Sequence, residues 1–529
     1  MKRILSFMLV AAMLLTMTAC SGGTKPDPTV EPTTQPAETT APAETTEPTV
    51  TEPDAQGVQF IDLMIGNDYT YEMTDDYILL ASVSCQPLRL AGQSAEAYPA
   101  LAAALEERNM VEKGDARENL EIMSEDARIM VEEMGAEFYG YTDTTVCLTQ
   151  RADEHILSVR EEYEVYNGMR PFWGTKGLNL DPATGERLHI DDILTDVSGL
   201  PQLIVDAMRE KYDYLSEEEF ESMEGWLEGY SPEGYTWTLS YQGVTFYFGV
   251  SELAAGAVGE LFVTLWFDEH PGLFVEKYTE VPGSGYALSL VQYDMNDVDL
   301  HPGDGKQDQL FVHSMADDEL IVGINGNNLY FTDYYAYSFE PYLVTCDNEH
   351  FYLYVDAAGD NDYRTIYIFD LSGDTPEFMT ALSGISFGGY WAEDGVDEIW
   401  YRPVFNDPSH VTMASKIDLL GTRTGKRSYQ INPSTGIPVA QTEYFNFSAY
   451  EGTMESLVEL ELLILPELTA EKIPAGTVFQ VLRTNGSTYM DARLPDGREC
   501  RIMVDRYGWE CMVNGMSEYE CFDGVHYAG

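Results

Sequence analysis

The chain has 529 residues, a length that fits roughly two to four domains. Lysine and arginine together number 29 and aspartate and glutamate 90, so the formal charge is −61 at pH 7. Nucleic-acid binding requires basic surfaces, so this charge excludes nucleic acid as an expected partner and favours cations and basic proteins. Apolar residues make up 44% of the chain, which is enough to form folded cores.

The N-terminus has the pattern of a secretory signal. Two basic residues precede an apolar run over 4–17, which is too short to span a bilayer as a lasting helix. The run ends in Met17-Thr18-Ala19-Cys20, which resembles the lipobox of bacterial lipoproteins. In that family the cysteine thiol carries a diacylglycerol. The resemblance implies a signal peptide over 1–19, lipid attachment at Cys20, and a location on the extracytoplasmic face of the cell membrane. The alternative is an ordinary signal peptide cut near Ala19.

Residues 20–57 are rich in proline, threonine and acidic residues and hold almost no large apolar side chain. Such a segment cannot bury a core, and its prolines and like charges extend it. We therefore expect a disordered tether that spaces the folded part of the chain from the membrane.

Residues 58–282 alternate between helical and strand periodicities, which predicts an α+β region with antiparallel sheet. We expect strands over 77–83, 138–148, 156–166, 235–241, 244–248 and 261–267. We expect helices over 98–105, 120–134 and 203–212. Ser216 and Glu219 have the spacing of a capping box, which predicts the start of another helix.

The same region resembles the paired extracellular domains of RsiV-type anti-sigma factors, which also precede the catalytic domain of PdaC-type peptidoglycan deacetylases. The segments that carry the resemblance are 156–159, 163–168, 178–185, 189–194, 243–248 and 252–256. RsiV-type proteins bind lysozyme outside the cell, so the resemblance implies a lysozyme-like partner. The Thr-Phe-Asp-Asp and His-x-x-x-His motifs of the deacetylases do not occur in the sequence, so the resemblance does not imply deacetylation.

The rest of the chain is predicted to be rich in strands. Residues 283–455 contain short aromatic strands separated by Gly, Asp and Asn turns, including the hairpin signal Asn325-Gly326, which predicts a sandwich or propeller-like region. Residues 456–529 contain hairpin signals at Asn485-Gly486 and Asp496-Gly497 and resemble a small SH3-like barrel. The alternative interpretation of this tail is a structural cap.

Acidic side chains crowd a glycine-containing loop that ends at Asp308. Calcium takes about six to eight oxygen ligands, often from closely spaced carboxylates on a tight turn. The loop resembles the Asp-x-Asn-x-Asp-Gly-x-x-Asp loops of calcium-bound β-proteins, with an insertion over 297–303. The candidate ligands are Asp294, Asn296, Asp299, Asp304 and Asp308. The alternative is a solvated acidic turn, and no other cofactor is predicted.

Six cysteines follow Cys20, and three of them, Cys500, Cys511 and Cys521, cluster in the small tail region. A disulfide would matter most there because a small domain buries little core. These three residues are therefore the disulfide candidates, and buried free thiols are the equal alternative.

No catalytic motif emerges, so we expect a protein that is not an enzyme. The sequence holds no His-Glu-x-x-His pair, no fitting Gly-x-Ser-x-Gly elbow and no glycine-rich phosphate loop. The favoured hypothesis is a surface-anchored lipoprotein that binds a cationic envelope partner, such as a lysozyme-like protein, or a cell-wall fragment. The alternatives are a cell-wall-modifying enzyme (a peptidoglycan hydrolase or a deacetylase accessory) and a purely structural envelope lipoprotein.

Replacing the predicted acylation site, Cys20→Ala, is expected to release the protein from membranes or to leave an uncleaved precursor, because the lipid and the cleavage both depend on the thiol. Cell fractionation with immunoblotting measures both outcomes. A Cys20→Ala protein that is processed and retained like the parent would show that Cys20 carries no anchor.

Overall fold

A computed structural model describes the unit formed by Val58–Gly529, with small gaps. The residues outside the description are 1–57, 257, 305, 316–317, 348, 361–362, 388–398, 400, 449–451, 509 and 529. The predicted signal peptide, Cys20 and the tether therefore lie outside the described residues. Within the described part, no helix is long and apolar enough to cross a membrane.

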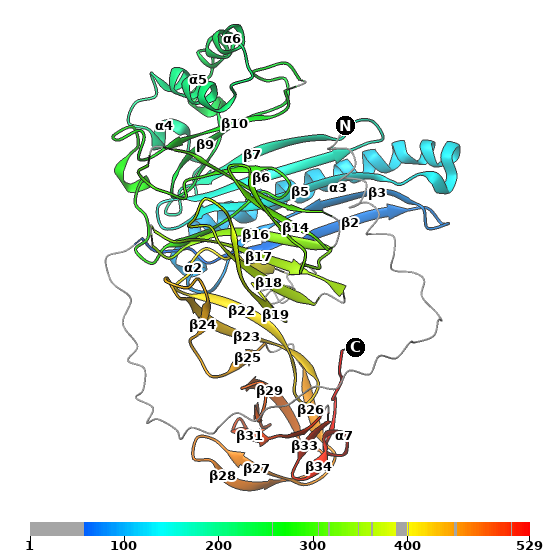
Figure 1. Cartoon of the computed structure of the whole chain (residues 1–529). Helices are drawn as coiled ribbons and strands as arrows, with labels where there is room; N and C mark the ends of the chain where they lie inside the picture. The colour runs from blue at the N-terminus through cyan, green and yellow to red at the C-terminus, as the bar shows by residue number, and fades with distance from the viewer. Residues whose placement is uncertain are drawn as a thin grey trace. The chain divides into compact units, whose positions relative to one another are not determined.

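A five-stranded sheet and one long helix form the first layer of the fold (Figure 1). The strand order is β2-β3-β5-β6-β7, with β3 and β5 parallel and the other pairs antiparallel. The strands are β2 (Asp68–Met73), β3 (Leu79–Cys85), β5 (Tyr141–Ala152), β6 (Leu157–Tyr166) and β7 (Phe172–Leu180). The helix α3 (Pro99–Met134) packs along β2, β3 and β5. The predicted strands are thus confirmed in type, with ends shifted by a few residues.

The two helices expected over 98–105 and 120–134 are parts of the single helix α3. Apolar residues near both ends of the helix are buried against the sheet. Between them, an ion pair of 2.6 Å joins Arg108 of the helix to Glu161 of β6. Because polar side chains make the contacts in this part of the helix, the apolar residues there do not repeat at helical spacing. The sequence pattern therefore predicted two helices where one helix is continuous. Gly135, with φ of 60°, ends the helix as predicted.

A second helical layer covers a three-stranded antiparallel sheet in the order β10-β9-β8. The elements are α5 (Leu200–Lys211), α6 (Glu217–Leu227), β8 (Thr236–Leu239), β9 (Gly243–Phe248) and β10 (Leu261–Trp266). The predicted capping box starts α6: the Ser216 hydroxyl accepts from the Glu219 N–H, and the Glu219 carboxylate accepts from the Ser216 N–H at 2.8 Å. The α+β class predicted for this region is confirmed.

Two antiparallel sheets of the following region face each other over one core that includes Leu288, Val312, Val322, Leu353 and Phe369. One sheet contains β11 (Tyr286–Ser289), β16 (Ser338–Thr345), β17 (Phe351–Ala358), β18 (Arg364–Asp370) and β19 (Glu377–Ser383). The other contains β12 (Met295–Val298), β13 (Asp308–Ser314), β14 (Leu320–Ile324) and β15 (Asn327–Phe331). Of the two predicted layouts, this arrangement is that of a sandwich.

The Asn325-Gly326 signal forms the predicted two-residue hairpin between β14 and β15. Both residues have positive φ, 50° and 84°, as a type I′ turn requires.

The C-terminal strands form a twelve-stranded sheet rather than a separate barrel. Its strands are β20 (Ile385–Ser386), β22 (Val411–Asp418), β23 (Thr422–Ile431), β24 (Pro438–Ala440), β25 (Phe445–Phe447), β26 (Thr453–Ser456), β27 (Leu460–Ile464), β28 (Thr469–Ile473), β29 (Val478–Thr484), β30 (Tyr489–Arg493), β31 (Glu499–Met503) and β35 (Phe522–Asp523). Among the described residues no sheet closes into a barrel, so the SH3-like barrel predicted for 456–529 is wrong. The reason is that β29 pairs with β25 of the preceding region on one edge and with β30 on the other.

The remaining elements are small. They are β1 (Leu63–Gly66), β4 (Leu88–Leu90), β21 (Tyr401–Pro403), β32 (Asp505–Tyr507), β33 (Glu510–Val513), β34 (Met516–Ser517), α2 (Gly92–Ala97), α4 (Ile190–Ile193) and α7 (Glu518–Cys521). The strand β1 lies between β21 and β4, so a segment near residue 64 pairs with one near residue 403.

Candidate functional site

The predicted calcium segment contains β12 and ends at the first residue of β13, and two of its five candidate ligands, Asn296 and Asp308, form hydrogen bonds that stabilise the fold. The side chain of Asn296 is buried, accepts from the Val291 N–H at 2.7 Å and donates to the Val291 carbonyl at 3.0 Å. Asp308 accepts from the Leu300 N–H at 3.0 Å and from the Asn325 amide at 2.6 Å. The side-chain oxygens of both residues are therefore already engaged in hydrogen bonds, including bonds to Val291 and Asn325 outside the acidic segment.

The other three candidates cap turns. Asp294, Asp299 and Asp304 each accept from a backbone N–H one or two residues ahead, at 2.8–3.1 Å. Burial raises the pKa of Asp299 to about 6. Within the described residues, no three His, Cys, Asp or Glu side chains gather as a metal site would require. Calcium binding therefore stays a prediction.

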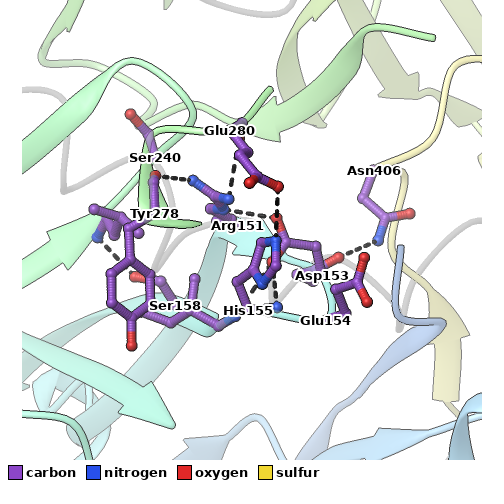
Figure 2. Close-up of polar contacts among 12 residues, drawn as sticks. Arg151, Asp153, Glu154, His155, Ser158, Ser240, Tyr278, Glu280 and Asn406 are labelled. Carbon is purple, nitrogen blue, oxygen red and sulfur yellow. Dashed lines mark hydrogen bonds and ion pairs between the residues drawn. The ribbon is translucent and has the colours of Figure 1, made fainter. Parts of the chain in front are cut away.

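A buried charged cluster lies at the end of β5 (Figure 2). Arg151, only 1% exposed, donates to the Asp153 carboxylate at 2.7 Å and to the carbonyls of Tyr278 and Glu280 at 2.6 and 3.1 Å. Its guanidinium also stacks over the ring of Tyr241, with 4.6 Å to the centroid. The N–H groups of the cation thus meet protein oxygens, and the Tyr241 ring covers one of its faces.

Asp153 extends this cluster to the N-terminal segment. Its carboxylate accepts from the His155 and Ile156 N–H groups, and its backbone bridges to Phe60. Close by, the Asn406 amide donates to the Ile61 carbonyl at 2.9 Å. Because these side chains are enclosed and engaged with one another, the cluster is suited to joining segments and not to acting on a ligand.

A small cavity lies between β6, β9 and β10 on one side and β11 and β12 on the other. Its lining includes Arg160, Thr264, Trp266 and Asp297, and its volume is about 30 Å³. Ligand pockets usually span roughly 300 Å³ or more, so this cavity is too small for an organic substrate. Two salt bridges of 2.6 Å, Arg160–Glu162 and Lys211–Asp297, compensate the buried charges beside it.

The six cysteines in the described part of the chain are buried free thiols, which agrees with the predicted alternative to a disulfide. No disulfide therefore joins Cys500, Cys511 or Cys521 in the structure, although the three share one core. Burial raises the pKa of Cys147 and Cys500 to about 12, so both stay protonated near neutral pH. A protonated thiol is a poor nucleophile, which makes these two cysteines unsuited to covalent catalysis.

Exposed carboxylates cover the solvent side of α3. The exposed acidic residues on this helix are Glu106, Glu107, Asp115, Glu118, Glu121, Glu125, Asp126, Glu132 and Glu133. The exposed basic residues there are Arg117 and Arg128, and Arg128 is paired with Glu72 at 2.9 Å. The helix α6 adds exposed acids at Glu217, Glu218 and Glu221 and holds no basic residue. Both helices therefore present a strongly negative surface to solvent.

Replacing the buried cation, Arg151→Leu, is expected to lower the free energy of unfolding by about 3–5 kcal/mol, because Asp153 would be left buried without its counter-ion. Urea unfolding followed by circular dichroism measures the change. Arg209→Leu is the matched control, because its partners Asp206 and Glu217 are exposed and such pairs contribute only about 0–1 kcal/mol. An Arg151→Leu loss no larger than that of the control would contradict the role of the cluster as an anchor.

If the acidic loop binds calcium, the ion is expected to stabilise the folded state by about 2.7 kcal/mol at a hundredfold excess over Kd. Thermal melting with calcium and with chelator tests this, and Asp299→Asn with Asp304→Asn should abolish the response. A melting temperature that millimolar calcium does not move would favour the plain acidic turn.

Comparison with known proteins gives structural neighbours but no family assignment. No family model and no curated protein matches the chain. Two solved structures of DUF3298 family proteins are similar to it. One, from Bacteroides fragilis, is 18% identical, with 41% of this chain and 95% of that chain covered and a TM-score of 0.31. The other, from Pseudomonas aeruginosa, is 10% identical, with 42% and 97% covered and a TM-score of 0.28.

Proposed function

We propose that this protein is a lipoprotein, anchored through Cys20 at the extracytoplasmic face of the membrane, that binds a cationic envelope partner without catalysis. The binding part is the α+β region 58–282, and a lysozyme-like protein is the expected partner. The observation that carries the proposal is the excess of exposed carboxylates over exposed basic side chains on α3 and α6.

These carboxylates provide a means of attracting a basic protein. Complementary charge increases association rates. The attraction is screened beyond a Debye length, which is about 8 Å at physiological salt. The salt bridges inside the fold use several of the few cations, including Arg108, Arg160 and Lys211, so these do not neutralise the surface. A Lys- or Arg-rich partner would supply the missing positive charge.

The chemistry of the described residues supports binding over catalysis. The histidines with a carboxylate partner, His155, His301 and His350, lie in three separate contacts, with Glu280, Asp308 and Asp347. A catalytic site brings a nucleophile, a base and an orienting group together in one place. Dispersed pairs of this kind are suited to stabilising loops.

Calorimetry of the mature chain against lysozyme tests the proposal. We expect one-to-one binding that persists at about 0.3 M salt, where long-range attraction is mostly screened. Cytochrome c, an unrelated basic protein, is expected to bind at least tenfold more weakly under the same conditions. Binding that disappears in salt, or equal binding of cytochrome c, would leave only non-specific electrostatics and contradict the proposal.

Charge variants test how α3 contributes. The triple change Glu118→Gln, Glu121→Gln and Glu125→Gln is expected to slow association several-fold at low salt, because these acids steer the partner. The matched control is Glu467→Gln, Asp505→Asn and Glu510→Gln, three exposed acids of the C-terminal region. Stopped-flow rates that fall equally for both triples would show that net charge alone, and not the α+β region, attracts the partner.

A further inference from the structure

One half of the five-stranded sheet is uncovered on the face opposite α3. The helix contacts one face through Arg108–Glu161, Lys113–Asp68 and Arg128–Glu72. Side chains alternate along a strand, so the residues next to these partners point to the other face. That second face includes Tyr69 and Tyr71 of β2 and Glu162 and Glu164 of β6.

The register brings one row of this second face across all five strands. Tyr69 pairs with Ser84, Ser84 with Thr144, Thr144 with Glu164, and Glu164 with Trp173. Adjacent strands are about 4.8 Å apart, so Tyr69 and Trp173 are separated by roughly 19 Å. The row has large aromatic side chains at both ends, short hydroxyl side chains between them, and one carboxylate beside the tryptophan.

The other half of this face is covered by the neighbouring sheet. Arg160 of β6 stacks over the Tyr247 ring at 4.6 Å, and Gly177 of β7 lies so close to Trp237 that a Cβ would fall 2.0 Å from its carbonyl oxygen. The cover ends before the row that holds Trp173. We name Tyr69, Tyr71, Thr144, Val146, Glu164 and Trp173 the open face.

The open face exposes apolar surface to solvent within the described part of the chain. Tyr69, Tyr71, Val146 and Trp173 are 42%, 51%, 37% and 41% exposed. The rings of Tyr69 and Tyr71 lie 5.7 Å apart, centroid to centroid, which orders them as a pair. Tyrosine and tryptophan are enriched among the residues that dominate binding energy, and clustered exposed apolar residues mark interaction sites.

The charge on this face selects the partner. Glu164 is half-buried, receives no hydrogen bond from another described side chain, and has a pKa raised by burial. Trp173, its neighbour in the row, is 41% exposed. Lysine and arginine cations bind both aromatic ring faces and carboxylates. The acidic segment 20–57 lacks this complementarity, because its charge has the same sign as Glu164.

We propose that the open face is the docking surface for a protein segment that carries lysine or arginine. The cation lies between Glu164 and the Trp173 ring, while apolar atoms of the segment pack on Tyr69, Tyr71 and Val146. The inference rests on the proposed function and deepens it by naming where the basic partner is held. The acids of α3, on the other side of the sheet, attract the partner but do not contact it.

Single substitutions in the mature chain test this surface against lysozyme at about 0.3 M salt. Trp173→Ala, Tyr69→Ala and Glu164→Gln are each expected to raise Kd at least tenfold, mainly through faster dissociation. The matched controls are Trp226→Ala, a 63% exposed tryptophan on α6, and Glu467→Gln, an exposed acid of the C-terminal region. Both controls should bind like the parent, and melting temperatures close to the parent's show that each variant is folded.

Fluorescence gives a second measurement. Lysozyme should change the tryptophan emission of the parent, and this change should shrink in Trp173→Phe, which keeps an aromatic ring and much of the affinity. Because lysozyme has tryptophans of its own, the change in emission on adding lysozyme is measured for the parent and for Trp173→Phe at equal saturation, and the two changes are compared.

The outcomes separate the inference from the proposed function. If the parent binds lysozyme and all three open-face variants bind it with the same affinity, the docking surface is overturned and the proposed function stands. A parent that does not bind lysozyme at this salt concentration would overturn both. Loss of binding to soluble peptidoglycan fragments in Trp173→Ala, with lysozyme binding intact, would assign the surface to glycans and overturn the cationic partner.

Discussion

The buried guanidinium of Arg151 fixes where distant parts of this chain meet. It joins the end of β5 to the carbonyls of Tyr278 and Glu280, and its partner Asp153 bridges to the segment at Phe60. Moving a charge out of water is costly, and the cost is recovered only when every donor and acceptor is engaged. The N-terminal segment, β5 and the loop after β10 are thus held in one arrangement, from which the five-stranded sheet extends.

The small number of basic residues also explains why the surface is acidic. With 29 basic residues against 90 acidic ones, each internal salt bridge removes a cation that could have neutralised the exterior. Four basic side chains that are themselves at most 12% exposed form salt bridges within the fold: Arg108, Arg151, Arg160 and Lys211. Among the exposed acids of α3 and α6, Glu217 pairs with Arg209 at 3.3 Å, and the others lie on helix surfaces that hold few basic side chains. The acidic exterior is therefore partly a consequence of how the interior is built, and this is why charge alone is a weak guide to a specific partner.

Local signals in the sequence predicted local structure well. The Ser216–Glu219 capping box, the Asn325-Gly326 hairpin and the Gly135 helix end depend on neighbouring residues, and the structure confirms them. Pairings between distant segments were not predictable in the same way. The tail was expected to close on itself, but β29 pairs with β25, and no local pattern specifies that edge. Likewise, the polar middle of α3 is explained by partners on the sheet, including Asp68 on β2 and Glu161 on a strand that begins 23 residues after the helix ends.

The same difference between local and long-range signals applies to the two candidate sites, the acidic loop and the open face. The acidic loop was visible as a run of closely spaced aspartates, yet hydrogen bonds to nearby backbone and side-chain groups account for much of that crowding. The open face was not visible, because Tyr69 and Trp173 are far apart in sequence and only the register of five strands places them in one row. The alternation of tyrosines with polar residues in 68–72 was the one available signal, and it fits an edge strand equally well.

A rigid sheet is well suited to hold a partner in this way. Residues on strands are positioned more precisely than residues on loops, so little ordering is needed when a ligand binds. The long helix buries the apolar side of the sheet and stabilises it without using the opposite face. Folding thus depends on the helix-covered face and on the half of the second face that packs on the neighbouring sheet, where Arg160 stacks on Tyr247. The open face is left free to retain aromatic and acidic side chains. Side chains that are exposed, apolar and aligned by register, at a position where the fold does not need them, are best explained by a contact with another molecule.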